Sequence, residues 1–203
     1  MQAYNKSELE NYFLAEEAKK LYQKKFLSKE QLQMIIAQLV QLKSNPNIFF
    51  RIGFFFLGSF LISTIISAFG LILFPLISED FEFIFFFYAI VAYIGLEVLV
   101  NMKFFRHGLD DAFVLTSQIS FSIGVGILTE AILPVLITML VLGVFFAIRF
   151  INTISALLAF IGLVGIFFNL IVEHDVMPKF YLSFVGLILA ILVYFFIVHL
   201  SKN

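Results

Sequence analysis

Long apolar runs separated by short polar segments dominate the sequence from about residue 50 onward. Six runs cover residues 50–77, 83–102, 111–129, 131–149, 152–172 and 179–200. A helix needs about 20 apolar residues to span a bilayer, and an open strand would leave its backbone groups unsatisfied in lipid. The pattern therefore predicts an all-α, polytopic membrane protein with about six transmembrane helices. The first run is long, so its helix is expected to end either near Gly70 or near Ser78.

The first 46 residues follow a different pattern, that of two short amphipathic helices within residues 7–43. Ser7 with Glu10, and Ser28 with Gln31, fit the capping box that begins many helices. The expected apolar stripes are Leu14, Ala18, Leu21 and Tyr22 on the first helix, and Leu32, Ile35, Ile36, Leu39 and Leu42 on the second. We therefore predict two domains, a cytoplasmic helical hairpin at 1–46 and a six-helix transmembrane domain at 47–203.

A two-helix hairpin is too small to bury a core of its own. Its apolar stripes must therefore pack against another surface. One possibility is a cap on the protein's own cytoplasmic face, and the other is a module for dimerisation or for docking a protein partner.

Composition supports the membrane interpretation and excludes some chemistry. The chain is 62% hydrophobic and only 13% charged, whereas soluble domains carry roughly 25% charged residues. Its side chains must therefore face lipid or other helices. The absence of cysteine excludes disulfides and thiolate chemistry. A net charge of −1 gives no indication of nucleic-acid binding.

Basic residues are distributed asymmetrically about the six predicted spans. Twelve of the thirteen Lys and Arg residues fall before the first span, in the second and fourth loops, or in the C-terminal tail. Lys and Arg are retained on the cytoplasmic side of membrane proteins. Both termini are therefore predicted to be cytoplasmic.

The stretch FFRHGLDDA, residues 104–112, concentrates polar side chains between the second and third spans. Gly108 is expected just after a helix, where a left-handed backbone is needed, and Asp110 or Asp111 at the N-cap of the next helix. The cations Lys103, Arg106 and His107 would then lie in the last turn of the second span. The cluster is interpreted as a structural corner, with the mouth of a substrate or ion path as the alternative.

Glu97 is the one carboxylate well inside a predicted span. Tyr93 and Asn101 lie one turn away on the same helix face. Arg51, at the cytoplasmic end of the first span, has a compatible depth, which predicts an Arg51–Glu97 ion pair. The alternative is a proton-relay carboxylate, because buried acids can titrate near neutrality.

Small residues at helical spacing predict three seams where helices approach closely. They are Ser59, Ser63 and Ser67 in the first span, Thr116, Ser120 and Gly124 in the third, and Ser155, Ala159, Gly162 and Gly165 in the fifth. The acidic group Glu173-His174-Asp175 is interpreted as a helix boundary and not as a metal site, because three consecutive residues cannot converge on one ion from a helix.

Three short stretches resemble a family of predicted bacterial multi-pass membrane proteins, a domain family of unknown function. They are LYQKKFLSKEQL at Leu21–Leu32, NPNIFFRIG at Asn45–Gly53 and RHGLDDA at Arg106–Ala112. The resemblance implies an N-terminal helical hairpin on a helical membrane domain in the bacterial cytoplasmic (inner) membrane. It implies no activity, and no site residues.

Two functional hypotheses follow. The first is a non-enzymatic membrane protein that acts through a protein partner or a second copy, with the lipid bilayer as its surroundings. The second is a small proton- or ion-coupled transporter that uses Glu97 and a cytoplasmic mouth at Arg106–Asp111. We find no nucleophile–base motif and no metal-ligand pair. Neither an enzyme nor a bound cofactor is therefore expected.

Overall fold

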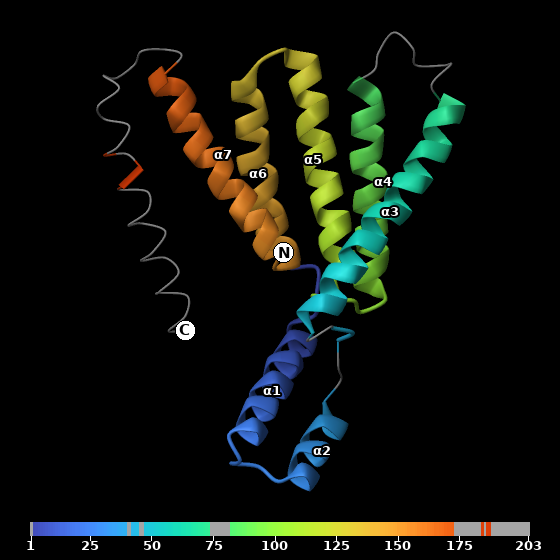
Figure 1. Cartoon of the computed structure of the whole chain (residues 1–203), viewed down its shortest axis with the longest axis vertical. Coiled ribbons are helices and arrows are strands. Elements are labelled where there is room, and N and C mark those ends of the chain that lie inside the picture. Colours follow the sequence, from blue (N-terminus) through green and yellow to red (C-terminus); the bar gives the residue numbers. More distant parts are fainter. Residues whose placement is uncertain are drawn as a thin grey trace.

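The computed structural model describes residues 2–39, 42–44, 47–73, 82–172, 184, 186 and 187. This part of the chain is all-helical, apart from one isolated bridge between Lys43 and Phe104. The helices are α1 (Lys6–Gln23), α2 (Lys29–Gln38), α3 (Ile48–Leu73), α4 (Glu82–Asn101), α5 (Leu109–Thr129), α6 (Ile132–Phe150) and α7 (Thr153–Val172). Figure 1 shows α1 and α2 at one end of the layer formed by α3 to α7.

The five helices α3 to α7 are each long and apolar enough to cross a membrane. They confirm the prediction of an all-helical chain with several helices suited to span a membrane, and their bounds lie within a few residues of the predicted runs. Helix α3 extends to Leu73, beyond Gly70. Ser78, the group Glu173-His174-Asp175 and most of the run 179–200 lie outside the described residues, so the count of six stays a prediction.

Helix α5 is the centre of the membrane layer, because it contacts α3, α4, α6 and α7. Figure 1 shows α4 to α7 side by side in chain order, with α3 crossing obliquely at one edge. Most of the buried polar side chains in the described helices belong to α5. Ser117, for example, donates from Oγ to the carbonyl of Ala89 in α4 at 2.9 Å.

The closest helix packing joins α6 and α7. A Cβ atom added to Gly143 of α6 would lie 2.7 Å from the backbone nitrogen of Ala159, and one added to Gly162 would lie 2.8 Å from the nitrogen of Leu140. These glycines let the backbones approach. The predicted small-residue seam of the fifth span is therefore confirmed.

The other two predicted seams have different outcomes. Ser120 and Gly124 are buried in α5, and a Cβ at Gly124 would meet the Phe86 ring of α4 at 3.1 Å. The seam predicted on the first span is wrong, because Ser63 and Ser67 are exposed. Ser63 instead donates to the carbonyl of Ser59 in its own helix, and the face of α3 toward α5 carries buried aliphatic side chains and Gly58.

Helices α1 and α2 contact each other and project from one end of the membrane layer (Figure 1). The predicted capping box of Ser28 and Gln31 is confirmed at the start of α2. The one predicted at Ser7 is wrong. Helix α1 begins at Lys6, and Asn5 is its N-cap, with its side chain accepting a hydrogen bond from the amide of Ser7. An Asn side chain satisfies a free helix N–H as well as Ser does.

The predicted apolar stripe of α1 is also wrong in most positions. The buried residues are Leu9, Tyr12, Ala15 and Ala18, whereas Leu14, Leu21 and Tyr22 are exposed. Both faces of α1 carry apolar side chains. The face that turns inward is selected by a contact with the α4–α5 loop, described below.

Candidate functional site

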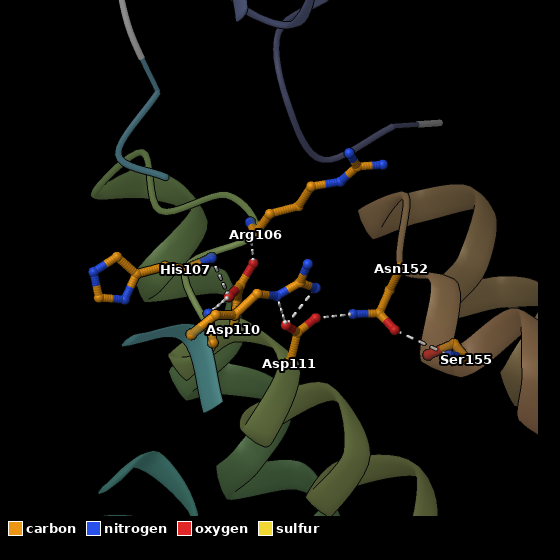
Figure 2. A network of polar contacts seen from close by, with 8 residues as sticks. Arg106, His107, Asp110, Asp111, Asn152 and Ser155 are labelled. Atoms are coloured by element: carbon orange, nitrogen blue, oxygen red, sulfur yellow. Dashed lines mark hydrogen bonds and ion pairs between the residues drawn. The ribbon is translucent and has the colours of Figure 1, made fainter. Parts of the chain in front are cut away.

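The polar side chains predicted to matter gather at the end of the membrane layer that carries α1 (Figure 2). Asp110, in the first turn of α5, is buried and accepts three backbone N–H groups of the preceding loop. Its partners are Arg106 at 2.7 Å, His107 at 3.0 Å and Gly108 at 2.9 Å. The carboxylate therefore holds the α4–α5 loop folded back onto the start of its own helix.

The N-cap of α5 is Gly108, with φ of 104°. The prediction of Asp110 or Asp111 at this position is wrong, because the loop amides turn toward the first helical turn and satisfy Asp110 there. The positive φ predicted for Gly108 is confirmed, but its predicted place just after the second span is wrong, because α4 ends at Asn101 and Gly108 directly precedes α5. A side chain at this position would also collide with the carbonyl of Arg51 in α3, so the glycine allows α3 to approach the loop.

Arg106, His107 and Lys103 lie in the loop and not in the last turn of the second span, because α4 ends at Asn101. The Arg106 side chain points away from both aspartates (Figure 2) and lies over the ring of Phe105. Helix α4 ends because Lys103 has φ of 65° and the N–H of Phe104 donates to the carbonyl of Leu99, which is a Schellman ending.

The His107 ring contacts two phenylalanine rings, those of Phe54 at 4.3 Å and Phe104 at 4.8 Å between centroids. Its Nδ1 atom is buried and makes no hydrogen bond within the described part of the chain. Burial lowers the pKa of His107, against an opposing effect of the Asp110 charge. The imidazole is therefore an apolar packing group here and not an exposed base.

Asp111 joins three helices. Its Oδ2 accepts from Arg51 of α3, at 2.8 Å from Nε and 2.6 Å from an Nη atom. Its Oδ1 accepts from the amide of Asn152, just before α7, at 2.7 Å. The Asp111 side chain is only 5% exposed. We name Arg51, Asp111 and Asn152 the buried latch, because they connect α3, α5 and α7.

The side-chain oxygen of Asn152, Oδ1, accepts a hydrogen bond from the backbone N–H of Ser155 at 2.9 Å (Figure 2). Asn152 thus caps the start of α7 with one end of its amide and holds Asp111 with the other. Both ends of the amide are satisfied, which fixes the orientation of the side chain.

Glu97 pairs with Arg149 near the end of α6, at 2.6 Å, and also accepts from the hydroxyl of Tyr93 at 2.7 Å. The predicted Arg51–Glu97 pair is therefore wrong. Helix α3 packs mainly on α5, which brings Arg51 to Asp111. The Glu97 and Arg149 side chains are 30% and 28% exposed. They bridge α4 and α6 across an edge of α5.

The N-terminal segment docks on this same end of the membrane layer. Phe105 is 1% exposed, and the rings of Tyr4 and Tyr12 meet it edge-on, each at 5.0 Å between centroids. The Tyr4 hydroxyl donates to the carbonyl of Phe104 at 2.9 Å. Burial raises the pKa of Tyr4, which keeps this donor protonated.

Backbone hydrogen bonds and one ion pair complete the docking. The N–H of Ala3 donates to the carbonyl of Arg149 at 2.8 Å, and that of Lys43 to the carbonyl of Lys103 at 2.8 Å. Lys103 also forms an ion pair with Glu8 at 2.7 Å. The segments before and after the α1–α2 pair are therefore both fastened to the membrane helices.

Among the described residues, no group of three or more His, Cys, Asp or Glu side chains could hold a metal ion. A cavity of about 260 Å³ lies between α5, α6 and α7, with an apolar surface. Of the polar side chains that line it, Ser122 donates to the Gln118 carbonyl and the Gln118 amide nitrogen to that of Met139, whereas Gln118 Oε1 is buried without a hydrogen-bond partner in the described part of the chain. The polar residues of the site therefore connect the ends of neighbouring helices, and we name this set of contacts the joint.

Sequence reasoning did not identify several residues of this joint. The stretch NTIS at 152–155 carried a usable signal, an Asn immediately before an apolar helix, which is a favoured N-cap. Arg149 is one of the basic residues that lie in the predicted fourth loop, where it indicates orientation but no partner. Tyr4 and Phe105 carried no signal, because aromatic residues are frequent throughout this chain.

Comparisons with protein families, with curated proteins and with solved structures found no match for this chain. The family resemblance seen in the sequence stays a prediction.

Proposed function

We propose that this protein is a non-enzymatic, multi-pass membrane protein that acts by contact with a protein partner or a second copy. The contacting part is residues 2–39, which we name the N-terminal unit. One observation carries the proposal: the unit projects from the membrane layer (Figure 1) with large apolar side chains in the open. Phe26 is 74% exposed and Met34 59%. Outside lipid, clustered apolar exposure marks interaction surfaces.

We also propose six spans with both termini in the cytoplasm, in a bacterial inner membrane. The orientation is supported by the basic residues Arg51, Lys103 and Arg149, which lie at the same end as the N-terminal unit. Glu82 and Glu130 lie at the opposite ends of α4 and α5. The bacterial assignment rests on the sequence resemblance alone.

The transporter hypothesis has less support. It requires Glu97, Asp110 and Asp111 to be accessible to a moving ion or proton. Asp110 is instead bonded to three loop amides, and Asp111 to Arg51 and Asn152. Glu97 is partly exposed but held by Arg149 and Tyr93.

Because the chain contains no cysteine, single cysteines report their own surroundings. Gln23→Cys, at an exposed position beside the apolar side chains of the unit, should react with a maleimide more slowly in native membranes than in the purified protein, since a partner covers it only in the membrane. The control, Gln33→Cys, lies on an exposed polar position of α2 and should react equally in both. Equal reactivity of both cysteines in both preparations would contradict the proposal. Proton-linked ion flux in liposomes that Glu97→Gln abolishes would support the transporter instead.

A further inference from the structure

The far end of the N-terminal unit, residues 19–29, is strongly basic, and we name it the basic tip. It carries Lys19, Lys20, Lys24, Lys25 and Lys29, all exposed. None of these lysines forms an ion pair within the described part of the chain. The neighbouring acid, Glu30, accepts a hydrogen bond from the hydroxyl of Ser28. Glu16 and Glu17 precede the tip by one turn of α1 and Glu30 follows it, so five lysines face three flanking carboxylates and an excess of positive charge remains at the tip.

Apolar side chains stand among these lysines. Leu21 is 38% exposed, Tyr22 40% and Phe26 74%. The surface thus combines cations with apolar groups, and a partner that covers it must supply both carboxylates or other anions and apolar contacts.

The turn at the tip uses a lysine where glycine is favoured. Lys25 has φ of 63°, its N–H donates to the carbonyl of Tyr22, and the N–H of Phe26 donates to that of Leu21. This is a Schellman ending, whose left-handed position is usually glycine because a Cβ is strained there. Phe26 stays mostly exposed and does not cover the helix end. Lys103, Arg106, Glu130 and Ile151 also have positive φ, so the backbone of Lys25 is not evidence of a contact. The exposed ring of Phe26 is the feature that points to a role in contact.

From these features we propose that the basic tip binds an acidic protein segment with apolar side chains among its carboxylates. This rests on the proposed function and adds the chemistry of the partner. Two other anionic partners fit less well, for reasons of distance and of side-chain type.

The first is the protein's own membrane surface. Helix α1 has 18 residues, so at 1.5 Å per residue the tip begins about 20 Å along the helix from its docked start and continues beyond about 27 Å. Charges are largely screened beyond a Debye length of about 8 Å at physiological salt. The lysines of the tip therefore do not experience the headgroups around α3 to α7.

The second is nucleic acid. Bases stack on aromatic rings, and Tyr22 and Phe26 could serve in this way. Leu21 and the nearby Met34 are also exposed, and aliphatic side chains offer no stacking face. A protein segment can make apolar contacts with all four side chains, whereas a nucleic acid can stack only on the two aromatic rings.

The test uses the full chain in nanodiscs of zwitterionic lipid. The probes are two displayed libraries of 12-residue peptides, one built from Asp, Glu, Leu, Phe and Ala, and one with Lys and Arg in place of the acids. Only the acidic library should yield binders. Fluorescence anisotropy of a selected peptide should show at least tenfold weaker binding to Lys24→Glu, and also to Phe26→Ala. The matched control Lys6→Glu changes the same charge at the docked end of α1 and should leave binding within twofold.

Absence of enrichment from the acidic library, or equal affinity for Lys24→Glu and Lys6→Glu, would overturn the proposal. It would also fail if a dT20 oligonucleotide or phosphatidylglycerol vesicles displaced the peptide with the same dependence on Lys24. Maleimide protection of Gln23→Cys in native membranes distinguishes failure of the acidic partner from failure of the proposed function. If protection persists when Lys24→Glu is added, the proposed function is retained and the acidic partner is refuted. If the single-cysteine protein without Lys24→Glu shows no protection, both proposals are refuted.

Discussion

Replacing Arg51 with glutamine should destabilise the protein more than replacing Asp111 with asparagine. The Asp111 side chain is 5% exposed and that of Arg51 29%. Without Arg51, the buried carboxylate keeps only the Asn152 amide. Without the carboxylate, the guanidinium can still reach water. Breaking a buried pair costs about 3–5 kcal/mol when a charge is left stranded. We expect about 3 kcal/mol for Arg51→Gln and about 1–2 kcal/mol for Asp111→Asn, after allowing for the exposure of Arg51.

The double variant should recover part of the loss, because two neutral amides replace the pair. Residues in one network show coupling energies of about 0.5–3 kcal/mol, and we expect about 1–2 kcal/mol here. Equilibrium unfolding in mixed detergent micelles measures each free energy. The matched comparison is the Glu97→Gln, Arg149→Gln cycle, where both side chains are near 30% exposed and coupling should stay below about 1 kcal/mol.

The combination of Arg51→Gln with Glu97→Gln provides the decisive control. These residues belong to different ion pairs, so their effects should add within about 0.5 kcal/mol. Strong coupling of Arg51 to Glu97, together with additivity between Arg51 and Asp111, would refute the buried latch. The depth-based pairing suggested by the sequence would then be correct.

Three further predictions concern packing, docking and pH. Gly143→Ala should lower the midpoint of thermal unfolding in detergent, because its Cβ would lie 2.7 Å from the backbone of Ala159. The control Gly53→Ala, whose Cβ would meet nothing within 4 Å, should leave the midpoint unchanged. Equal midpoints for the two variants would contradict the α6–α7 packing. Phe105→Ala should release the N-terminal unit, seen as faster tryptic cleavage at the α1 lysines, and an unchanged rate would show that docking does not depend on this ring. The folded-state pKa of His107 lies below the usual value of about 6.5, so the unfolded state takes up the proton first and stability falls as pH drops through that value. His107→Phe should therefore reduce the midpoint loss between pH 7.5 and 5.5; an identical loss in both proteins would exclude His107 as its source.

The span positions could be predicted because hydropathy is a local property of the chain. The run 131–149 and the helix Ile132–Phe150 differ by a single residue at each end. Transfer of an apolar segment into lipid depends on its own composition and length, and requires no knowledge of neighbouring helices. The same locality explains why Ser28 was correctly identified as a cap.

The pairing of charges could not be predicted in this way. Depth in the membrane allowed Glu97 to pair with Arg51, but depth does not say which helices are neighbours. Arg149 also lies at this end, and the contact of α3 with α5 decides between the two arginines. The inward face of α1 was missed for a related reason, since Phe105 selects it through a contact between residues far apart in sequence.

The hydrogen bond from Ala3 to the carbonyl of Arg149 joins residues made at very different times during synthesis. Translation proceeds at about 5–20 residues per second, so the first segment waits on the order of ten seconds before its acceptor exists. During this interval Tyr4 and Tyr12 have no finished surface to cover. The contacts to Lys103 and Phe105 need only the chain up to the α4–α5 loop, but docking of the N-terminal unit is completed late in synthesis, after α6 has been made.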